Sequence, residues 1–509
     1  MRSYRGLALG WLLVLTLLHL WLIASGRWPL SGDEAHYWEW SRRLDWSYYS
    51  KGPLVAYLIA ASTRLGGATE FWVRLPAVLL GTATAAIAYL LARRTFPEDR
   101  PAFLSLVLLS VMPLYAVGAV LMTIDAPFVC CWGLACLCLS RVKARQGELA
   151  WYAAGVVFGL GLLAKYTMFM LVPCVALWLA SSPRLRPWFR RQEPYLAAAL
   201  GLLIFSPVIV WNARHGWYSM RHVLIQAGGN AERSVWNALL GGPEFFGSQV
   251  GVVSPLLFGL LVVGVVWAWR EGIRRERDEL TLLVCTSVPV FLFFQLWSFV
   301  SKVQANWAAH AYLTAVVAAA GWCQTWMRTG VSRRSRQRLH QYLLAAILLP
   351  AALLSVAVAP ELIEWTGFRI PPALDLVAKR LHGWPELGRA VGAAMARVPG
   401  RPFLVADHYQ VASQLAFYVP GHPTVYTANF GRRMNQYDVW GGWEQLPGRD
   451  GVIVLQGIVA PNSDLREAFR TLEPLETVTL TDRGRRLREF TILWGREFRG
   501  FPARPFAGY

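Results

Sequence analysis

The sequence has few charged residues for its length. Asp, Glu, Lys and Arg make up 16% of the 509 residues, and hydrophobic residues make up 55%, whereas a soluble protein usually has about 25% charged residues. The apolar residues also gather into runs close to the ~20 residues that cross a bilayer. This composition excludes an ordinary soluble protein and predicts a polytopic membrane protein.

Cysteines are also few, and they form no recognisable pattern. All seven lie within apolar runs, at Cys130, Cys131, Cys136, Cys138, Cys174, Cys285 and Cys323. Their spacing is typical neither of a disulfide framework nor of zinc ligands, so we interpret them as small buried hydrophobic residues. No cysteine follows Cys323, and we therefore expect the C-terminal part to fold without disulfides.

Motifs for nucleotide binding are missing. The sequence has no Gly-rich phosphate loop, no GxGxxG and no Walker motif, so a cytosolic site for ATP or a nucleotide sugar is unsupported. The net charge of +19 does not indicate a nucleic-acid partner either, because much of it follows the distribution that membrane topology requires.

About eleven apolar runs lie in the first 359 residues. They fall near 7–25, 71–92, 102–121, 126–140, 151–164, 167–180, 194–211, 250–269, 279–297, 309–327 and 341–359. The first run lacks an A-x-A cleavage site, so we interpret it as an uncleaved helix. Arg-rich connections such as 184–191 and 328–338 alternate with connections that have few cations, such as 298–308. The positive-inside rule places the Arg-rich connections and the N-terminus in the cytoplasm.

The C-terminal part has a different pattern. Beyond residue 360, β-like runs such as "RPFLVAD" and "DGVIVLQG" alternate with turn residues and with an amphipathic helix near "SDLREAFRTLEP". We therefore expect a transmembrane bundle over 1–359 and a soluble α/β domain over 360–509, which the topology places on the extracytoplasmic face.

The same topology brings unusual segments to that face. Asp33 and Glu34 follow the first span, next to a dense run of Trp and Tyr that suits a segment at the membrane interface. A carboxylate there is a candidate base, or only a hydrophilic residue that ends the span. Asp125 lies in a turn between two spans, where an acidic residue is a candidate for function or an N-cap of the next helix.

Cations and polar residues accompany these carboxylates. Lys51 is a candidate phosphate ligand, with snorkelling at a helix end as the alternative. Further candidates for substrate binding are Glu34, Tyr49, Lys165, Tyr166, Arg214, Arg221, Lys302, Asn306 and, in the C-terminal domain, Arg433. A single cation in a loop indicates little, but several cations and carboxylates that converge on one bundle would form a site.

The order of these segments resembles a known family. "DEAHYWEW", "WSYYSKGPLVAYLI", "RLPAVLLG", "LMTIDAP", "LGLLAKYT", "FSPVIVWNARHGW" and "KVQANW" follow one another over about residues 30–310. This series resembles the bacterial branch of the protein-O-mannosyltransferase-like GT-C glycosyltransferases, which includes the aminoarabinose lipid A transferase. The series is specific for the family and not for a substrate.

The resemblance implies an enzyme of the cytoplasmic (inner) membrane with an extracytoplasmic active site and a polyprenyl-phosphate sugar donor. Asp33 matches the family's usual catalytic carboxylate, Asp125 matches the acidic residue of the second outer turn, and Lys51 matches a lysine that contacts lipid phosphate. Ser50 stands where the aminoarabinose transferase has a glutamate. A zinc site like that enzyme's is therefore not expected, no cofactor is assigned, and a role for a divalent cation stays open.

The expected reaction moves a sugar to an envelope glycolipid, glycan or protein acceptor, with Asp33 as the base and Asp125 orienting the acceptor or the base. Arg433 lies in a polar and aromatic stretch that suits sugar binding or a solvated loop. The alternative function is a transporter or flippase of lipid-linked sugars. Transporters favour two related halves with sites at the bilayer midplane, and this sequence shows neither feature.

Overall fold

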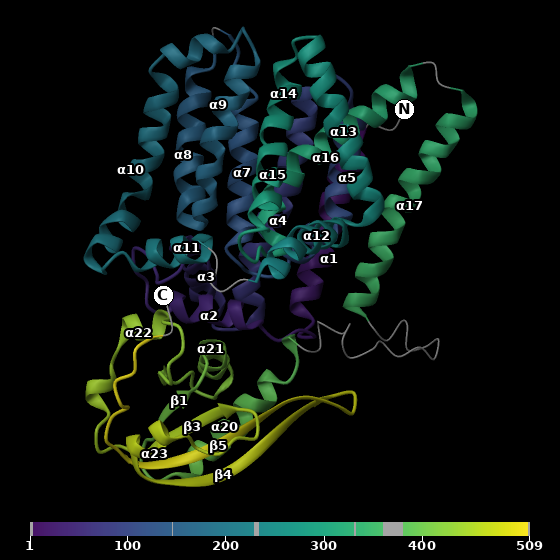
Figure 1. Ribbon diagram of the computed structural model, residues 1–509. Coiled ribbons are helices and arrows are strands. Elements are labelled where there is room, and N and C mark those ends of the chain that lie inside the picture. Colours follow the sequence, from purple (N-terminus) through teal and green to yellow (C-terminus); the bar gives the residue numbers. More distant parts are fainter. Residues whose placement is uncertain (1–3, 145, 229–233, 330–331, 360–379, 507–509) are drawn as a thin grey trace.

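The computed structural model describes residues 4–144, 146–228, 234–329, 332–359 and 380–506. Within them, a bundle of helices is joined at one end to a smaller domain that contains the β-sheet (Figure 1). This arrangement confirms the predicted class, a helical multi-pass membrane protein with a small C-terminal sheet domain. The predicted boundary between residues 359 and 360 stays a prediction, because residues 360–379 lie outside the described ranges.

The bundle is built from the apolar runs of the sequence. Its elements are α1 (Tyr4–Ala24), α4 (Glu70–Thr95), α5 (Asp99–Val111), α6 (Pro113–Gly118), α7 (Asp125–Leu139), α8 (Glu148–Ala164), η1 (Tyr166–Met170), α9 (Leu171–Ser181), η2 (Arg186–Arg190), α10 (Glu193–Arg214), α11 (Tyr218–Gly228), α12 (Val235–Val253), α13 (Pro255–Arg274), α14 (Asp278–Cys285), α15 (Val288–Trp297), η3 (Ala305–Ala308), α16 (Ala309–Arg328) and α17 (Arg333–Val358). By length and composition, α1, α4, α10, α13, the segment Asp278–Trp297 and α17 can each cross a membrane. The expected number of about eleven spans stays a prediction.

Two parts of the bundle differ from the expected pattern. The run over 102–121 is divided between α5 and α6, because Pro113 has no N–H to continue the hydrogen bonds of α5 and instead begins α6. The connection over 212–249 contains α11 and most of α12. The start of α12 is marked by Ser234, whose hydroxyl accepts a hydrogen bond from the backbone N–H of Asn237.

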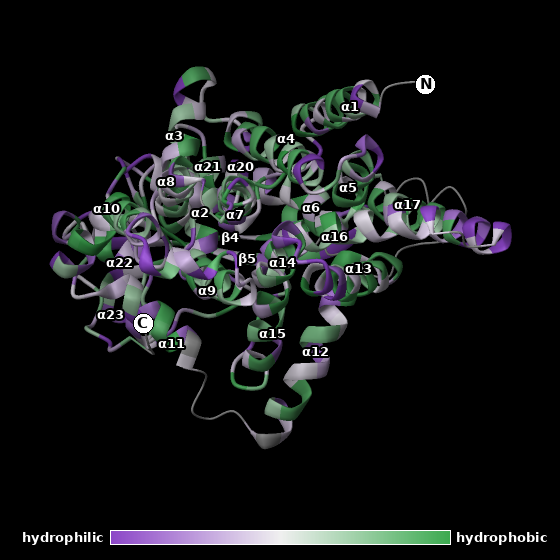
Figure 2. Ribbon diagram, turned by 90° about the horizontal axis from the view of Figure 1, so that it is seen from above, coloured by the Kyte–Doolittle hydropathy of each residue, from purple (hydrophilic) through white to green (hydrophobic). Residues whose placement is uncertain are grey.

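The last bundle helix lies at the edge of the bundle, where Leu339, Leu343 and Ala346 pack against its neighbours. Seen from above, α17 projects from the edge of the bundle (Figure 2), and only 17% of its most apolar window is buried. Leu344, Leu348 and Leu353 are exposed along it. Exposed leucines on a long apolar helix are what a lipid-facing surface requires.

Two short helices lie between the bundle and the C-terminal domain (Figure 1). They are α2 (Gly32–Ser41) and α3 (Leu54–Gly66). The aromatic residues of this segment were expected at the membrane interface, but Trp38, Trp40 and Tyr48 are almost wholly buried within the protein. Their rings pack against one another and against the C-terminal domain, so the segment forms part of the core that joins the two.

The C-terminal domain is a mixed sheet with helices. It contains α20 (Trp384–Arg397), β1 (Phe403–Ala406), α21 (Tyr409–Tyr418), β2 (Val425–Thr427), α22 (Gln436–Trp440), η4 (Trp443–Gln445), β3 (Gly451–Gln456), α23 (Ser463–Ala468), β4 (Phe469–Asp482) and β5 (Arg485–Phe498). The strand order is β2-β1-β3-β5-β4; β1 is parallel to β2 and β3, and β5 is antiparallel to β3 and β4.

The helix predicted near "SDLREAFRTLEP" is present but shorter than that stretch. It ends at Ala468, and the rest of that stretch is the start of β4. Arg483 and Gly484 both have positive φ angles, of 48° and 74°, and form the two-residue turn of a long β4–β5 hairpin. Pairing with β5 thus overrides the local helical pattern.

A single face of α21 fixes the C-terminal domain to α2. His36 Nδ1 lies 2.9 Å from Ser413 Oγ, and Gln414 Nε2 donates to the carbonyl of Leu30 at 2.8 Å. The rings of Trp38 and Phe417 meet edge to face at 4.8 Å. The spacing of these α21 residues is that of one helix face, so the sheet domain packs through this face against the segment that carries Asp33.

Candidate active site

A cavity of about 1580 Å³ extends from the C-terminal domain into the bundle. Its polar end is lined by residues of α2, the α2–α3 connection, α7, η3 and α21. Its other end is lined by apolar residues of α1, α4, α5 and α6, among them Leu15, Ala85, Leu109, Leu114 and Val117. The cavity is therefore amphipathic, with charge at one end and hydrocarbon at the other.

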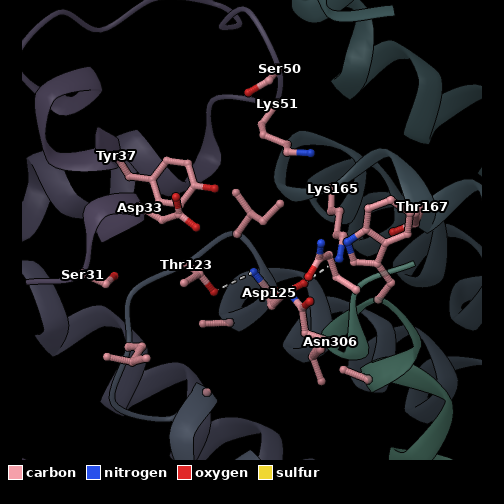
Figure 3. Close-up of a pocket in the computed structure, with 18 of the residues that line it drawn as sticks. Ser31, Asp33, Tyr37, Ser50, Lys51, Thr123, Asp125, Lys165, Thr167 and Asn306 are labelled. Carbon is pink, nitrogen blue, oxygen red and sulfur yellow. Dashed lines mark hydrogen bonds and ion pairs between the residues drawn. The ribbon is translucent and has the colours of Figure 1, made fainter. Parts of the chain in front are cut away.

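Most of the residues singled out in the sequence come together in this cavity. Those that line it are Asp33, Tyr49, Lys51, Asp125, Lys165, Tyr166, Asn306 and Arg433. They come from separate stretches of the chain, and Figure 3 shows Asp33, Lys51 and Asp125 arranged around one space.

Asp33 is placed by the start of α2. The Ser31 hydroxyl accepts from the backbone N–H of Glu34, and the Glu34 carboxylate accepts from the backbone N–H of Ser31, so a capping box begins the helix. Asp33 lies in the first turn with an exposed side chain. Its Oδ1 accepts a hydrogen bond from Gln410 Nε2 of α21 at 2.9 Å, and its other oxygen has no hydrogen bond within the described residues.

Glu34 does not join the site, although it neighbours Asp33. Its carboxylate is fully buried and forms a bidentate ion pair with Arg74, with both contacts at 2.8 Å. It also accepts from the backbone N–H of Met122 at 3.1 Å. With its oxygens occupied in this way, Glu34 holds α2, α4 and the turn before α7 together, and we do not retain it as a substrate ligand.

Asp125 organises a second polar group. Its Oδ1 accepts from Lys165 Nζ at 2.7 Å and its Oδ2 accepts from Asn306 Nδ2 at 2.5 Å, as Figure 3 shows. Its backbone N–H donates to the Thr123 hydroxyl at 3.3 Å. Asp125 therefore joins the start of α7, the end of α8 and the η3 segment through one carboxylate.

Lys51 lies on a tightly held turn. A Cβ added to Gly52 would lie 2.1 Å from the carbonyl oxygen of Leu163, so only glycine permits this close approach to α8. The Tyr49 N–H donates to Gln436 Oε1 at 2.6 Å, which ties the turn to the C-terminal domain. The carbonyl of Lys51 accepts from the backbone N–H of Tyr48 at 3.2 Å, but its ammonium group forms no hydrogen bond or ion pair within the described ranges.

The surroundings of Lys51 change its acidity. Burial, followed by the charge of Lys165, lowers the pKa of Lys51 to about 8, while Asp125 and Asp33 oppose this shift and Arg433 adds to it. The ammonium group is therefore poorly solvated by the protein and is suited to binding an anion that enters the cavity.

Three predicted cations lie outside the cavity. Arg214, Arg221 and Lys302 are exposed and do not line it. The guanidinium of Arg214 lies over the ring of Trp46, 5.7 Å from its centroid. Arg214 is the last residue of α10, Arg221 lies within α11 and Lys302 follows α15, and their side chains do not line the cavity.

Tyr166 and Tyr49 line the cavity with their rings largely buried. The Tyr166 hydroxyl donates to Ser219 Oγ at 3.2 Å and lies 3.3 Å from Ser47 Oγ. The ring of Tyr49 lies 5.1 Å from that of His222. Both tyrosines therefore present mainly aromatic surface to the cavity.

The sequence interpretation missed several lining residues around Asp33. Tyr37, Tyr409 and Gln410 all line the cavity. Burial, followed by the negative charge of Asp33, raises the pKa of Tyr409 to about 12, and burial likewise raises the pKa of Tyr37. Both hydroxyls therefore stay protonated. Tyr37 follows Asp33 by four positions on α2, and this helical spacing was a signal that the two share one face.

The site does not fit a metal centre of three or more ligands. Among the described residues, no group of three His, Cys, Asp or Glu side chains comes close enough to hold a metal ion. Ser50 offers a hydroxyl where the family resemblance gives a carboxylate, and both oxygens of Asp125 are already engaged. We therefore route no step of the chemistry through a metal.

The fold and the site define a class: a multi-pass membrane protein with the GT-C architecture. Its structure aligns with that of ArnT from Cupriavidus metallidurans bound to undecaprenyl phosphate, with a TM-score of 0.65 and 16% identity, over 96% of this chain and 98% of the other. At that identity the likeness concerns the fold.

Sequence comparison gives the family. Residues 50–211 match the family described as dolichyl-phosphate-mannose-protein mannosyltransferase. The lipid A galacturonosyltransferase RgtD of Rhizobium johnstonii is 29% identical over 392 residues, which are 76% of each chain. The undecaprenyl phosphate-alpha-4-amino-4-deoxy-L-arabinose arabinosyl transferase 2 of Proteus mirabilis is 28% identical over 55% of this chain and 54% of its own length. The chain is thus related to the protein-O-mannosyltransferase-like GT-C glycosyltransferases, as its motifs predicted.

Proposed function

We propose that the protein is an integral membrane glycosyltransferase that moves a sugar from a polyprenyl-phosphate donor to a glycolipid acceptor of the lipid A type. The amphipathic cavity carries this proposal, because a polyprenyl-phosphate sugar has the same two parts, a charged head and a hydrocarbon chain. The relatives that are named as lipid A and undecaprenyl phosphate transferases support it.

The donor head binds at Lys51 in this proposal. The prenyl chain lies along the apolar end of the cavity, and the phosphate meets the ammonium group, for which the described residues supply no hydrogen-bonded partner. A charge-assisted hydrogen bond to phosphate is among the stronger polar contacts. Tyr49 and Tyr166 offer aromatic surface beside the phosphate to the sugar or the first prenyl unit.

Asp33 acts as the general base. Its free oxygen removes the proton of an acceptor hydroxyl, and the oxygen of that hydroxyl forms a bond to the anomeric carbon as the bond from this carbon to the phosphate oxygen breaks. The bonding electrons leave with the polyprenyl phosphate, whose charge Lys51 stabilises. Attack from the side opposite the phosphate inverts the anomeric centre. Tyr37 and Tyr409, both protonated, are placed to donate to sugar oxygens.

The second polar group supports this chemistry indirectly. Because Asp125 is bound to Lys165 and Asn306, it is not free to serve as the base. We assign it the role of holding Lys165 and η3 so that one wall of the cavity has a fixed shape.

The site is assigned to the extracytoplasmic face of the inner membrane. The Arg-rich connection between α13 and α14 and the start of α17 lie at the end of the bundle away from the sheet domain (Figure 1), and arginine-rich loops favour the cytoplasm. Labelling of single cysteines in a cysteine-free variant tests this. A cysteine at Ser332 should be shielded from an impermeant reagent in intact cells, and one at Ser463 should react; the reverse pattern would contradict the assignment.

The activity is tested with the purified protein in lipid nanodiscs. The donor is undecaprenyl phosphate that carries a radiolabelled sugar, and the acceptor is lipid A extracted from cells that lack the gene. The protein should transfer the label from this donor to this acceptor. In liposomes, the same protein should not move the labelled donor between leaflets. Movement of the donor without transfer would overturn the proposal in favour of a flippase, and mass spectrometry of envelope glycolipids with and without the gene identifies the natural product.

A further inference from the structure

The lining of the cavity contains more positive than negative side chains. Among the described residues, five cations line it, Lys51, Lys165, Arg380, Arg432 and Arg433, together with two carboxylates, Asp33 and Asp125. A glycosyl phosphodiester carries a single negative charge, and its binding at Lys51 would leave positive charge unmatched. Arg380 directly follows residues outside the described ranges, so the question is which of the other cations remains available.

Two of the five cations are already paired within the protein. Lys165 is bound to Asp125, and Arg432 forms two hydrogen bonds to the carboxylate of Asp438 at 2.7 and 2.8 Å. Arg432 also donates to the carbonyl of Ala428 and to the Thr427 hydroxyl, both at 2.8 Å. Its guanidinium is therefore a structural clamp for the loop that follows β2.

Arg433, the next residue, is different. Its side chain is exposed to the cavity, and its guanidinium has no hydrogen bond or ion pair in the part of the chain that the structure describes. The loop around it is nevertheless well fixed, because Asn435 and Asp438 form a capping box at the start of α22. An arginine held on a fixed backbone, with its fork of donors unused, is suited to bind an oxyanion.

Arg433 also has a fixed relation to Lys51. The Gln436–Tyr49 hydrogen bond of 2.6 Å joins their two loops, and it lies three residues from Arg433 and two from Lys51. The two cations therefore line one cavity from two parts of the chain, Lys51 from the α2–α3 connection and Arg433 from the C-terminal domain.

We propose that Arg433 forms a second anion subsite beside the phosphate subsite at Lys51. This second subsite binds an oxyanion of the donor sugar or of the acceptor. This inference rests on the proposed function. The oxyanion is either a carboxylate on the transferred sugar, which makes that sugar a uronic acid, or a phosphate on the lipid acceptor. Arginine binds both groups through two parallel N–H donors. A cationic amino sugar is disfavoured at this subsite because it would be repelled by Arg433.

The donor arm of the test compares sugars that differ in one group. Undecaprenyl phosphate galacturonic acid and undecaprenyl phosphate galactose differ only in a carboxylate against a hydroxymethyl group. If the carboxylate occupies the subsite, wild-type protein has a higher kcat/KM for the uronic acid, and Arg433→Gln lowers that value about ten- to a hundredfold while barely changing the value for galactose. Undecaprenyl phosphate 4-amino-4-deoxy-arabinose should be the poorest donor.

The acceptor arm uses lipid A with and without its phosphates. If an acceptor phosphate occupies the subsite, Arg433→Gln lowers kcat/KM for the phosphorylated acceptor alone, whichever donor is used. Arg433→Lys, which keeps the charge, should restore part of the loss in either arm, and Arg401→Gln, an exposed arginine of the same domain outside the cavity lining, should match wild type. The melting temperature of each variant should equal that of the wild type, so that a loss of kcat/KM is not caused by misfolding.

The outcomes separate this inference from the proposed function. Transfer that is insensitive to Arg433→Gln with every donor and acceptor would overturn the second subsite and leave the glycosyltransferase intact. Preference for the amino sugar by wild-type protein, together with an Arg433→Gln effect that does not depend on the acceptor phosphates, would also overturn it. Absence of transfer from all three donors to both acceptors would instead contradict the proposed function.

Discussion

The cavity contains two polar regions made of the same kinds of residue, yet their charges are arranged differently. In the α2 region, Asp33 and Lys51 face the cavity; Asp33 accepts one side-chain hydrogen bond from Gln410, and the ammonium group of Lys51 forms none within the described residues. In the α7 region, the carboxylate of Asp125 is bound on both sides, by Lys165 and by Asn306.

In the proposed reaction, this difference separates groups that react from groups that support. A carboxylate whose oxygens are engaged within the protein cannot easily accept a proton from a substrate, and a lysine that is already paired offers little to a phosphate. The Asp125–Lys165 pair of the α7 region resembles the Glu34–Arg74 pair in that both ion pairs join separate helices. The Glu34–Arg74 pair is the more deeply buried of the two. Similar residue types thus take different roles because of what each one contacts.

The largest effect is expected from Asp33→Asn. The amide keeps the size of the side chain and can still contact Gln410, but it cannot accept a proton, so sugar transfer should fall by about 10²- to 10⁴-fold. Binding of the lipid donor should be retained, which serves as the control. Turnover of the purified variant at the wild-type rate would rule out Asp33 as the base.

Removing the charge of Asp125 should act mainly on stability. In Asp125→Asn, the nearly buried ammonium of Lys165 loses its partner, which costs about 3 kcal/mol in a buried pair and lowers the melting temperature. The double variant Asp125→Asn/Lys165→Met removes both charges and should recover most of the loss. If the double variant melts no higher than the single one, the pair does not have the supporting role assigned to it.

A change at Gln410 should alter the pH dependence of the reaction and not only its rate. Gln410→Glu places a second carboxylate beside Asp33, and like charges favour protonation of one of them. The acidic limb of the profile of kcat/KM against pH should therefore move to higher pH. Gln410→Ala removes the hydrogen bond without adding charge and should lower kcat with little movement of that limb; equal profiles in both variants would show that Gln410 only packs.

The pKa of Lys51 gives a smaller, separate pH effect. Because the folded protein lowers this pKa from 10.5 to about 8, Lys51 is charged below pH 8 and loses its charge as the pH rises through that value. The kcat/KM for the donor should therefore decline above about pH 8 in the wild type. Lys51→Arg stays charged and should not show the decline. If the variant shows the same decline as the wild type, the decline is caused by the titration of another group.

The sequence pattern indicated the residues at the polar end of the cavity better than those at its borders. Asp33, Lys51, Asp125, Lys165 and Asn306 were found because each interrupts or ends an apolar segment, where a polar side chain needs a reason to be present. The position of a residue in a loop did not show which way its side chain points. For this reason the sequence interpretation also included Arg214, Arg221 and Lys302, which do not line the cavity.

For the fold as well, features that depend on local sequence were predicted, and features that depend on contacts between distant segments were not. The apolar runs predicted the helices, and "RPFLVAD" and "DGVIVLQG" became β1 and β3. The role of Gln410 depends on α21 packing against α2, which is far away in the chain, and the start of β4 depends on pairing with β5. Neither contact leaves a pattern within its own stretch of sequence.

The most direct test of the account is the affinity of the purified protein for undecaprenyl phosphate, measured for wild type, Lys51→Ala and Lys165→Met. The comparison of the two regions predicts that Lys51→Ala weakens binding about ten- to a hundredfold, the value of a charge-assisted contact. Lys165→Met should change binding less than about threefold, since Lys165 is committed to Asp125 and offers the phosphate little. Unchanged binding by Lys51→Ala, together with a large loss in Lys165→Met, would contradict the account.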